Sequence, residues 1–181
     1  MPAKKYIFGG FIIVLLSVIT IFNSFGNVRL KDIAPEFYEL IQSGNLGDVT
    51  LTIYYMSLTV DTRLVHIDDL VNRRFNSQKI TVDGTRLEEH LDLFKQLSNV
   101  DFTPVRRRAF LDARIYYVFE TEQYGNIFDV GMWGSRGHYL SMFANRIELR
   151  ENDIFYEIIL PFLPEDMVEF LKDGGFLISG R

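Results

Sequence analysis

The feature that most constrains this chain is an uncharged run from Tyr6 to Val28, directly after Lys4 and Lys5. The hydrocarbon core of a bilayer is about 30 Å thick, and a helix of roughly 20 residues crosses it. The segment from Tyr6 to Phe25 has that length, and it lacks the polar stripe of a helix in a soluble core. The sequence therefore predicts a transmembrane helix over Tyr6 to Phe25.

The charges on either side of this run predict its orientation. The two lysines before it and the amino terminus outweigh Arg29 and Lys31, so we expect the amino end in the cytoplasm and the remaining chain outside it. The alternative is a secretory signal peptide that is cleaved near Gly26, after small side chains. Because the apolar stretch of such a signal spans about 7–15 residues, the longer run here favours an uncleaved anchor.

The chain contains no cysteine. Disulfides, a thiolate nucleophile and thiolate metal ligands are therefore excluded. A domain on the outer side of a membrane must then be stabilised by its apolar core alone. The chain also has no Asn-x-Ser/Thr acceptor for glycosylation, and both features are typical of a bacterial envelope protein.

About 150 residues follow Val28, which is a typical length for one domain. All 24 acidic residues and 17 of the 19 basic residues lie in this part, so its net charge is −7. An acidic domain is not expected to bind nucleic acid or an anionic membrane surface as its main task. No repeat or Pro/Gly-rich linker divides it. We predict an anchor over residues 1–28 and one extracytoplasmic domain over residues 29–181.

Helices are predicted near both ends of this domain. The first covers about residues 33–42, with Asp32 as its cap, Pro35 in its first turn and Gly44 at its end. A closing helix begins at Pro164. The apolar residues that share one face of the closing helix are Met167, Phe170 and Leu171.

The clearest helix pattern covers about residues 85–99. Thr85 and Glu88 have the spacing of a capping box, in which each side chain accepts a hydrogen bond from a backbone N–H of the first turn. Apolar residues then recur at helical spacing and predict one buried face. These residues are Leu87, Leu91, Phe94 and Leu97.

Most of the remaining patterns predict strands. Residues 49–58 and 79–82 are rich in β-branched and apolar side chains, and from Leu111 to Glu120 apolar residues alternate with mostly polar ones. This alternation predicts a strand with one buried face. Helices segregated from a late antiparallel sheet predict an α+β fold with two to four helices after the anchor. Later strands are predicted at residues 127–133, 139–143, 146–149 and 154–160.

Two patterns contain only part of a catalytic or metal-binding motif. His66 and Asp68 are two residues apart and would share one face of a strand, but no further ligands with recognisable spacing accompany them. The glycine-rich turn at residues 131–137 lacks the spacing of a phosphate loop, and Ser135 lacks the frame of a nucleophile elbow. The sequence therefore predicts no catalytic residue, no metal site and no cofactor.

A first candidate for partner binding is the turn that follows Trp133. Together with Arg136, His138 and Tyr139, this residue would form a recognition surface, because Trp, Tyr and Arg dominate many binding surfaces. The competing interpretation places Trp133 against the core, since tryptophan is highly buried on average.

A second candidate is the basic run of Arg106, Arg107 and Arg108. Guanidinium groups bind phosphate and carboxylate groups, so this run is a candidate anion site. The competing interpretation is a solvated loop that pairs with acidic neighbours.

These patterns predict a membrane-anchored binding domain of unknown specificity, which contacts a protein or another component of the cell envelope. One alternative is an envelope hydrolase that uses Asp, Glu or His chemistry. Another is an accessory subunit of a membrane complex, whose helix over Tyr6 to Phe25 packs on other helices.

Overall fold

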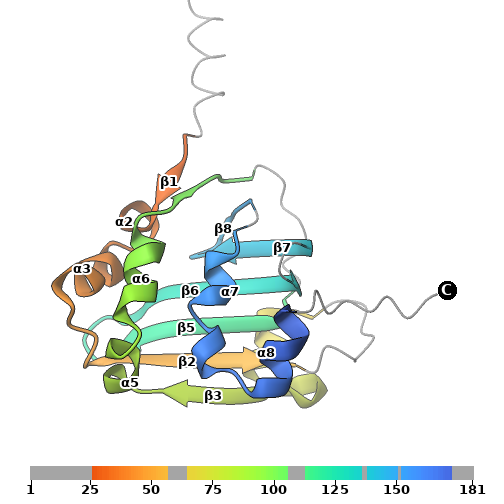
Figure 1. The fold of residues 1–181 in the computed structure, drawn as a ribbon. Coiled ribbons are helices and arrows are strands. Elements are labelled where there is room, and N and C mark those ends of the chain that lie inside the picture. The colour runs from red at the N-terminus through yellow and green to blue at the C-terminus, as the bar shows by residue number, and fades with distance from the viewer. Residues whose placement is uncertain (1–25, 57–64, 106–112, 136–137, 151, 173–181) are drawn as a thin grey trace, which may run out of the picture.

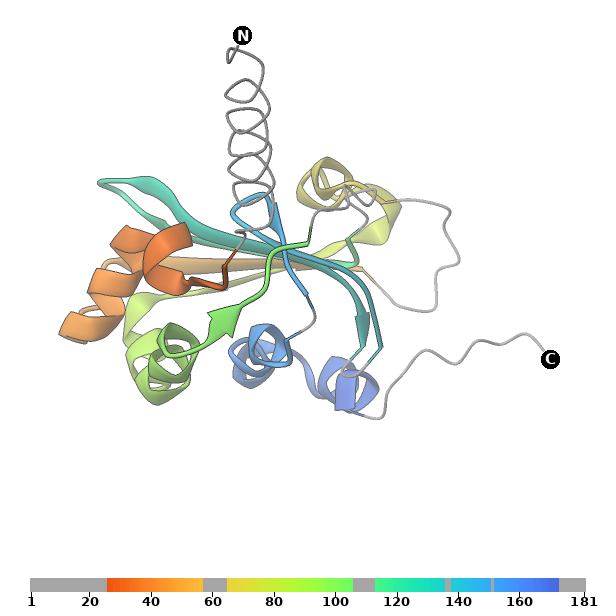
Figure 2. The same cartoon turned by 90° about the horizontal axis from the view of Figure 1, so that it is seen from above.

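The structure is a computed structural model that describes residues 26–56, 65–105, 113–135, 138–150 and 152–172. A six-stranded sheet forms its centre, and helices cover much of one face of this sheet (Figures 1 and 2). The helix predicted over Tyr6 to Phe25 lies outside the described residues. Within the described ranges, no helix is long and apolar enough to span a bilayer.

All neighbouring strands of the sheet are antiparallel, which confirms the predicted α+β class. The strand order is β3-β2-β5-β6-β7-β8, so β3 and β8 form the two edges. A separate pair joins β1 (Val28–Arg29) to β4 (Asp101–Phe102). The six strands are β2 (Val49–Tyr55), β3 (Gln78–Val82), β5 (Ile115–Thr121), β6 (Gly125–Ser135), β7 (His138–Ala144) and β8 (Ile147–Glu148).

Short helices are more numerous than the two to four predicted. The segment over α4 and η1 packs on the sheet face opposite to α6, α7 and α8, and it is yellow in Figure 2. The helical segments are α2 (Leu30–Ile33), α3 (Pro35–Ser43), α4 (Ile67–Val71), η1 (Arg74–Asn76), α5 (Gly84–Glu88), α6 (Leu91–Ser98), α7 (Ile154–Glu157), η2 (Leu160–Phe162) and α8 (Glu165–Lys172).

The first predicted helix is divided into α2 and α3 at Ala34. The carboxylate of Asp32 accepts a hydrogen bond from the backbone N–H of Arg29 at 2.8 Å, so Asp32 lies inside α2 and does not cap the helix that follows. The end of the prediction is confirmed, because Gly44 adopts the left-handed conformation at φ 72° after α3.

The helix predicted over residues 85–99 is also divided, into α5 and α6. The predicted capping box of Thr85 and Glu88 is wrong. The N-cap of α5 is Asp83, whose carboxylate accepts a hydrogen bond from the backbone N–H of Arg86 at 3.0 Å. Glu88 instead accepts a hydrogen bond from the backbone N–H of Leu46 at 3.1 Å. Because the helix is broken between α5 and α6, the predicted apolar residues do not all lie on one helix face, and Leu91 is only half-buried. Leu87, Phe94 and Leu97 are fully buried, as predicted.

Residues 154–160 were predicted as the last strand, and this prediction is wrong, because α7 and the start of η2 occupy them. Every residue of this segment except Glu157 is apolar or aromatic. Periodicity alone does not distinguish a short buried helix from a buried strand in such a segment. A local signal for the helix precedes it, since the side chain of Asn152 accepts a hydrogen bond from the backbone N–H of Ile154 at 3.0 Å. The closing helix α8 is where the sequence predicts it.

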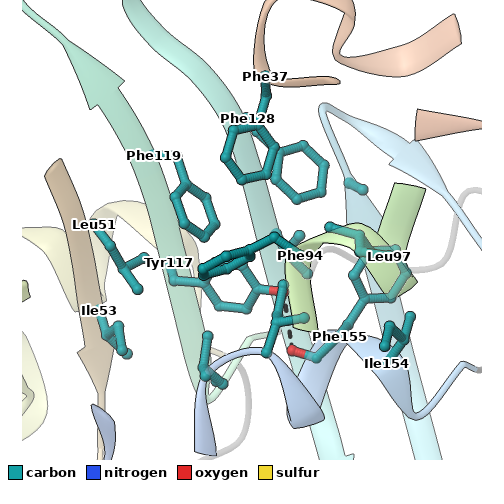
Figure 3. Close-up of a cluster of buried hydrophobic side chains, with 14 of the residues drawn as sticks. Phe37, Leu51, Ile53, Phe94, Leu97, Tyr117, Phe119, Phe128, Ile154 and Phe155 are labelled. Carbon is teal, nitrogen blue, oxygen red and sulfur yellow. Dashed lines mark hydrogen bonds between the residues drawn. The ribbon is translucent and has the colours of Figure 1, made fainter. Parts of the chain in front are cut away.

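The core between the helices and the sheet contains a central group of aromatic rings among aliphatic side chains (Figure 3). Phe37 of α3 stacks on Phe128 of β6 with ring centroids 5.2 Å apart. The hydroxyl of Tyr117 donates a hydrogen bond to the backbone carbonyl of Phe155 at 2.9 Å, so β5 is joined to α7. Burial raises the pKa of Tyr117, which keeps this hydroxyl protonated.

The opposite face of the sheet is not the solvated face that the alternation in β5 predicts. Tyr116 and Val118 are buried there against a second apolar cluster. Leu70 of α4 and Phe143 of β7 contribute to this cluster, so β5 is buried on both faces for most of its length. Helix α4 therefore covers this second face of β5, and the alternation within β5 alone does not predict that.

Candidate functional site

An open groove with a volume of about 910 Å³ lies at the end of the sheet where β2 begins and β5 ends. Four carboxylates line it, from Asp48, Asp83, Glu120 and Glu122. No Lys, Arg or His is among the described residues that form its wall. The groove therefore presents negative charge to solvent.

Strand pairing brings these four residues together. Val49 pairs with Thr121, which places Asp48 beside Glu120 and Glu122 at the start of β2. On the other side of β2, Leu51 pairs with Val82, and Asp83 follows directly. The turns at the ends of three strands thus meet at one end of the sheet, on the left in Figure 1.

The wall of the groove depends on a close approach between two backbone segments. A β-carbon built on Gly84 would overlap the carbonyl oxygens of Leu46 and Gly47. Only glycine therefore allows the start of α5 to lie directly against the loop before β2. The carboxylate of Asp83 is fixed in the same place, because it caps α5.

The other wall is the hairpin between β5 and β6. Tyr124 lies at its tip, with 58% of its surface exposed, and Gly125 supplies the left-handed conformation that the turn needs at φ 67°. The backbone N–H of Tyr124 donates to the hydroxyl of Thr121 at 3.0 Å, which orders the turn. Tyr124 thus lines the same groove as the carboxylates and contributes an exposed aromatic side chain to it.

The strand face that His66 and Asp68 were expected to share is not formed. These residues lie on no strand, because His66 precedes α4 and Asp68 is in its first turn. The nearby carboxylate of Asp69 accepts from the backbone N–H of His66 at 3.2 Å and pairs with Arg74 at 3.0 Å. Within the described part of the chain, no three His, Asp or Glu residues are grouped in a way that would hold a metal ion.

Trp133 lies near the end of β6 and is half-buried. The guanidinium of Arg114, a residue with only 5% of its surface exposed, lies 5.0 Å from the centroid of the indole ring. His138 and Tyr139 pair through β7 with Ser135 and Gly134 of β6. The backbone thus brings three of the four predicted partner-binding residues to one end of the β6–β7 hairpin.

The remaining predicted site residues lie outside the described ranges. These are Arg136 of the turn and the basic run Arg106, Arg107 and Arg108. Both the partner-binding surface at Trp133 and the anion site at the basic run therefore stay predictions.

The acidic groove has no counterpart in the sequence analysis. Its four carboxylates are separated by up to 74 positions and form no motif, so only the strand register reveals them. A weak signal existed, because each of the four lies within two residues of a predicted strand end. No protein-family model, curated protein or solved structure matches this chain.

Proposed function

We propose that this chain is a binding protein anchored in a membrane, and that its domain binds a basic segment of a protein partner in the acidic groove. The observation that supports this proposal is the lining of the groove, with four carboxylates and no basic side chain among its described residues. Charge complementarity of this kind attracts partners and selects between them.

The exposure of the groove and its several carboxylates favour an extended ligand. An open groove leaves its carboxylates in contact with water, so binding a cation there does not require complete desolvation of either charge. The exposed ring of Tyr124 adds a cation–π contact that is worth about 0.5–1 kcal/mol at an accessible site. A Lys- or Arg-rich peptide offers several cations at once, which suits carboxylates spread along two walls.

The anchor is supported by the uncharged run and by the distribution of charge around it. Only Gly26 and Asn27 separate the run over Tyr6 to Phe25 from β1, so the domain would lie close to the bilayer surface. We expect the full chain to remain membrane-bound, and protease added to intact spheroplasts to digest residues 29–181. Protection of the domain would contradict the orientation, and a soluble chain beginning near Asn27 would contradict the anchor.

The groove is tested with a fluorescent ten-residue oligolysine peptide and the full chain in non-ionic detergent micelles. We expect anisotropy to report binding that weakens as salt rises. The double variant Glu120→Gln/Glu122→Gln should weaken it about tenfold, because each exposed ion pair contributes up to roughly 1 kcal/mol. The matched control is Glu165→Gln/Glu169→Gln on α8, which makes the same change of net charge outside the groove.

Equal losses in the two double variants would mean that the peptide responds to net charge alone, and the groove proposal would then be wrong.

The hydrolase alternative predicts a different result with the same proteins. Carboxylates that catalyse hydrolysis of envelope material would give an activity that Glu120→Gln or Glu122→Gln abolishes.

A further inference from the structure

The two edges of the sheet differ in how they are covered. At the β8 edge, Pro104 forms a bridge with Leu149, and the backbone N–H of Val105 donates to the carbonyl of Glu148 at 2.9 Å. At the β3 edge, no strand of the described ranges pairs with the outer side of residues 78–82 (Figure 1). Strand β3 therefore presents a row of backbone donors and acceptors.

Proteins usually protect such an edge with a bulge, a proline or an outward lysine. Strand β3 pairs with β2 through five consecutive residues without a register shift, and it contains no proline. Its one lysine, Lys79, is turned back over the neighbouring strand, with its ammonium 5.7 Å from the ring centroid of Tyr54. The edge is thus regular, and the ammonium of Lys79 does not extend outward to block pairing with another strand.

We infer that β3 is a dimerisation strand, which pairs antiparallel with β3 of a second copy of this chain about a two-fold axis at Ile80. Ile80 is the middle residue of the five, so only this register pairs the whole strand. It places Lys79 opposite Thr81 of the second copy and keeps the two lysines from facing each other directly. Like charges directly opposite on one face of a sheet are destabilising.

The side chains on the covered face fit this register as well. Ile80 is only half-buried, although it packs against the main core. Pairing with Ile80 of the second copy would bury more of both side chains, on the face that carries α6, α7 and α8. Two six-stranded sheets would thereby become one continuous sheet.

The absence of cysteine allows a direct test, because each introduced thiol is the only one in its chain. Directly opposed residues have Cβ atoms about 4.5–5.5 Å apart, whereas diagonal neighbours are about 7–8 Å apart. A disulfide needs close Cβ atoms, so mild oxidation of the full chain in membranes should cross-link Ile80→Cys as a dimer. We expect at least about fivefold less dimer from Lys79→Cys, Thr81→Cys and the exposed control Tyr124→Cys.

A charge change at the opposing position provides a second, independent readout. In the Ile80→Cys chain, Thr81→Glu places a carboxylate opposite Lys79 of the second copy, twice per dimer, and should raise the yield of cross-linked dimer. Thr81→Lys places like charges there and should lower the yield about threefold to tenfold. Thr81 is exposed, so neither change should disturb the fold.

Cross-linking that is equal at positions 79, 80 and 81, or that ignores the sign of charge at position 81, would overturn this inference. A cross-linked product of Ile80→Cys with a mass other than twice that of the chain would also overturn it, since the edge would then bind a different protein.

Discussion

Replacing Phe119 by alanine is expected to destabilise the domain by about 3–5 kcal/mol, the usual cost of removing a large aromatic side chain from a core. Phe119 is completely buried, and its ring centroid lies 4.4 Å from that of Phe37 and 5.7 Å from that of Phe94. It also contacts Phe128 of the next strand at 6.0 Å. The side chain therefore joins α3, α6 and the sheet, and no smaller residue reaches all three.

The measurement is chemical denaturation of residues 29–181, which we expect to fold as a unit because the core needs no disulfide or metal. A domain has a total stability of about 5–15 kcal/mol, so Phe119→Ala should move the midpoint far towards low denaturant or abolish the folded state. Tyr124→Ala removes a comparable ring from an exposed turn and should change the midpoint little. Similar effects of the two variants would contradict the assignment of Phe119 to the centre of the core.

The fold class and most strands were predictable because their physical causes are local. Residues 49–55 and 78–82 carry β-branched and apolar side chains at strand spacing, and the turn between β5 and β6 contains Gly125. The end of α3 was predictable for the same reason, since Gly44 alone supplies the left-handed conformation there.

The errors arise where the local pattern has two solutions and tertiary contacts decide between them. Residues 154–160 form α7 and the start of η2 because this segment packs across the aromatic core, where Phe155 stacks on Phe102 at 4.9 Å. Tyr116 is buried because α4 covers its face of the sheet. Neither partner can be identified from the pattern of the segment itself.

The acidic groove illustrates the same limit for function. Asp48, Asp83 and Glu120 lie far apart in the chain, and their separation in space depends on which strands are neighbours and in which register. A one-residue slip in the pairing of β2 with β5 would turn the hairpin side chains to the other face. Candidate residues could be predicted from composition only where they were adjacent in sequence, as in the basic run and the turn after Trp133.

Gly84→Ala is the second substitution with a large expected effect, and it tests how the groove is built. The new β-carbon would overlap the backbone carbonyl oxygens of Leu46 and Gly47, and backbone atoms cannot rotate away as the end of a side chain can. We expect a loss of about 3 kcal/mol, at the upper end of the usual cost of overpacking. Thermal or chemical denaturation of residues 29–181 measures it.

The matched control is Gly47→Ala, in the loop that faces Gly84. A β-carbon at Gly47 has the Glu88 carboxylate as its nearest neighbour, at 3.5 Å, which is an ordinary contact with a flexible side chain. This variant should therefore be close to wild type in stability. If Gly84→Ala were equally mild, the start of α5 would have to move away from the loop before β2, and the wall that carries Asp83 would not be fixed in the position that the groove requires.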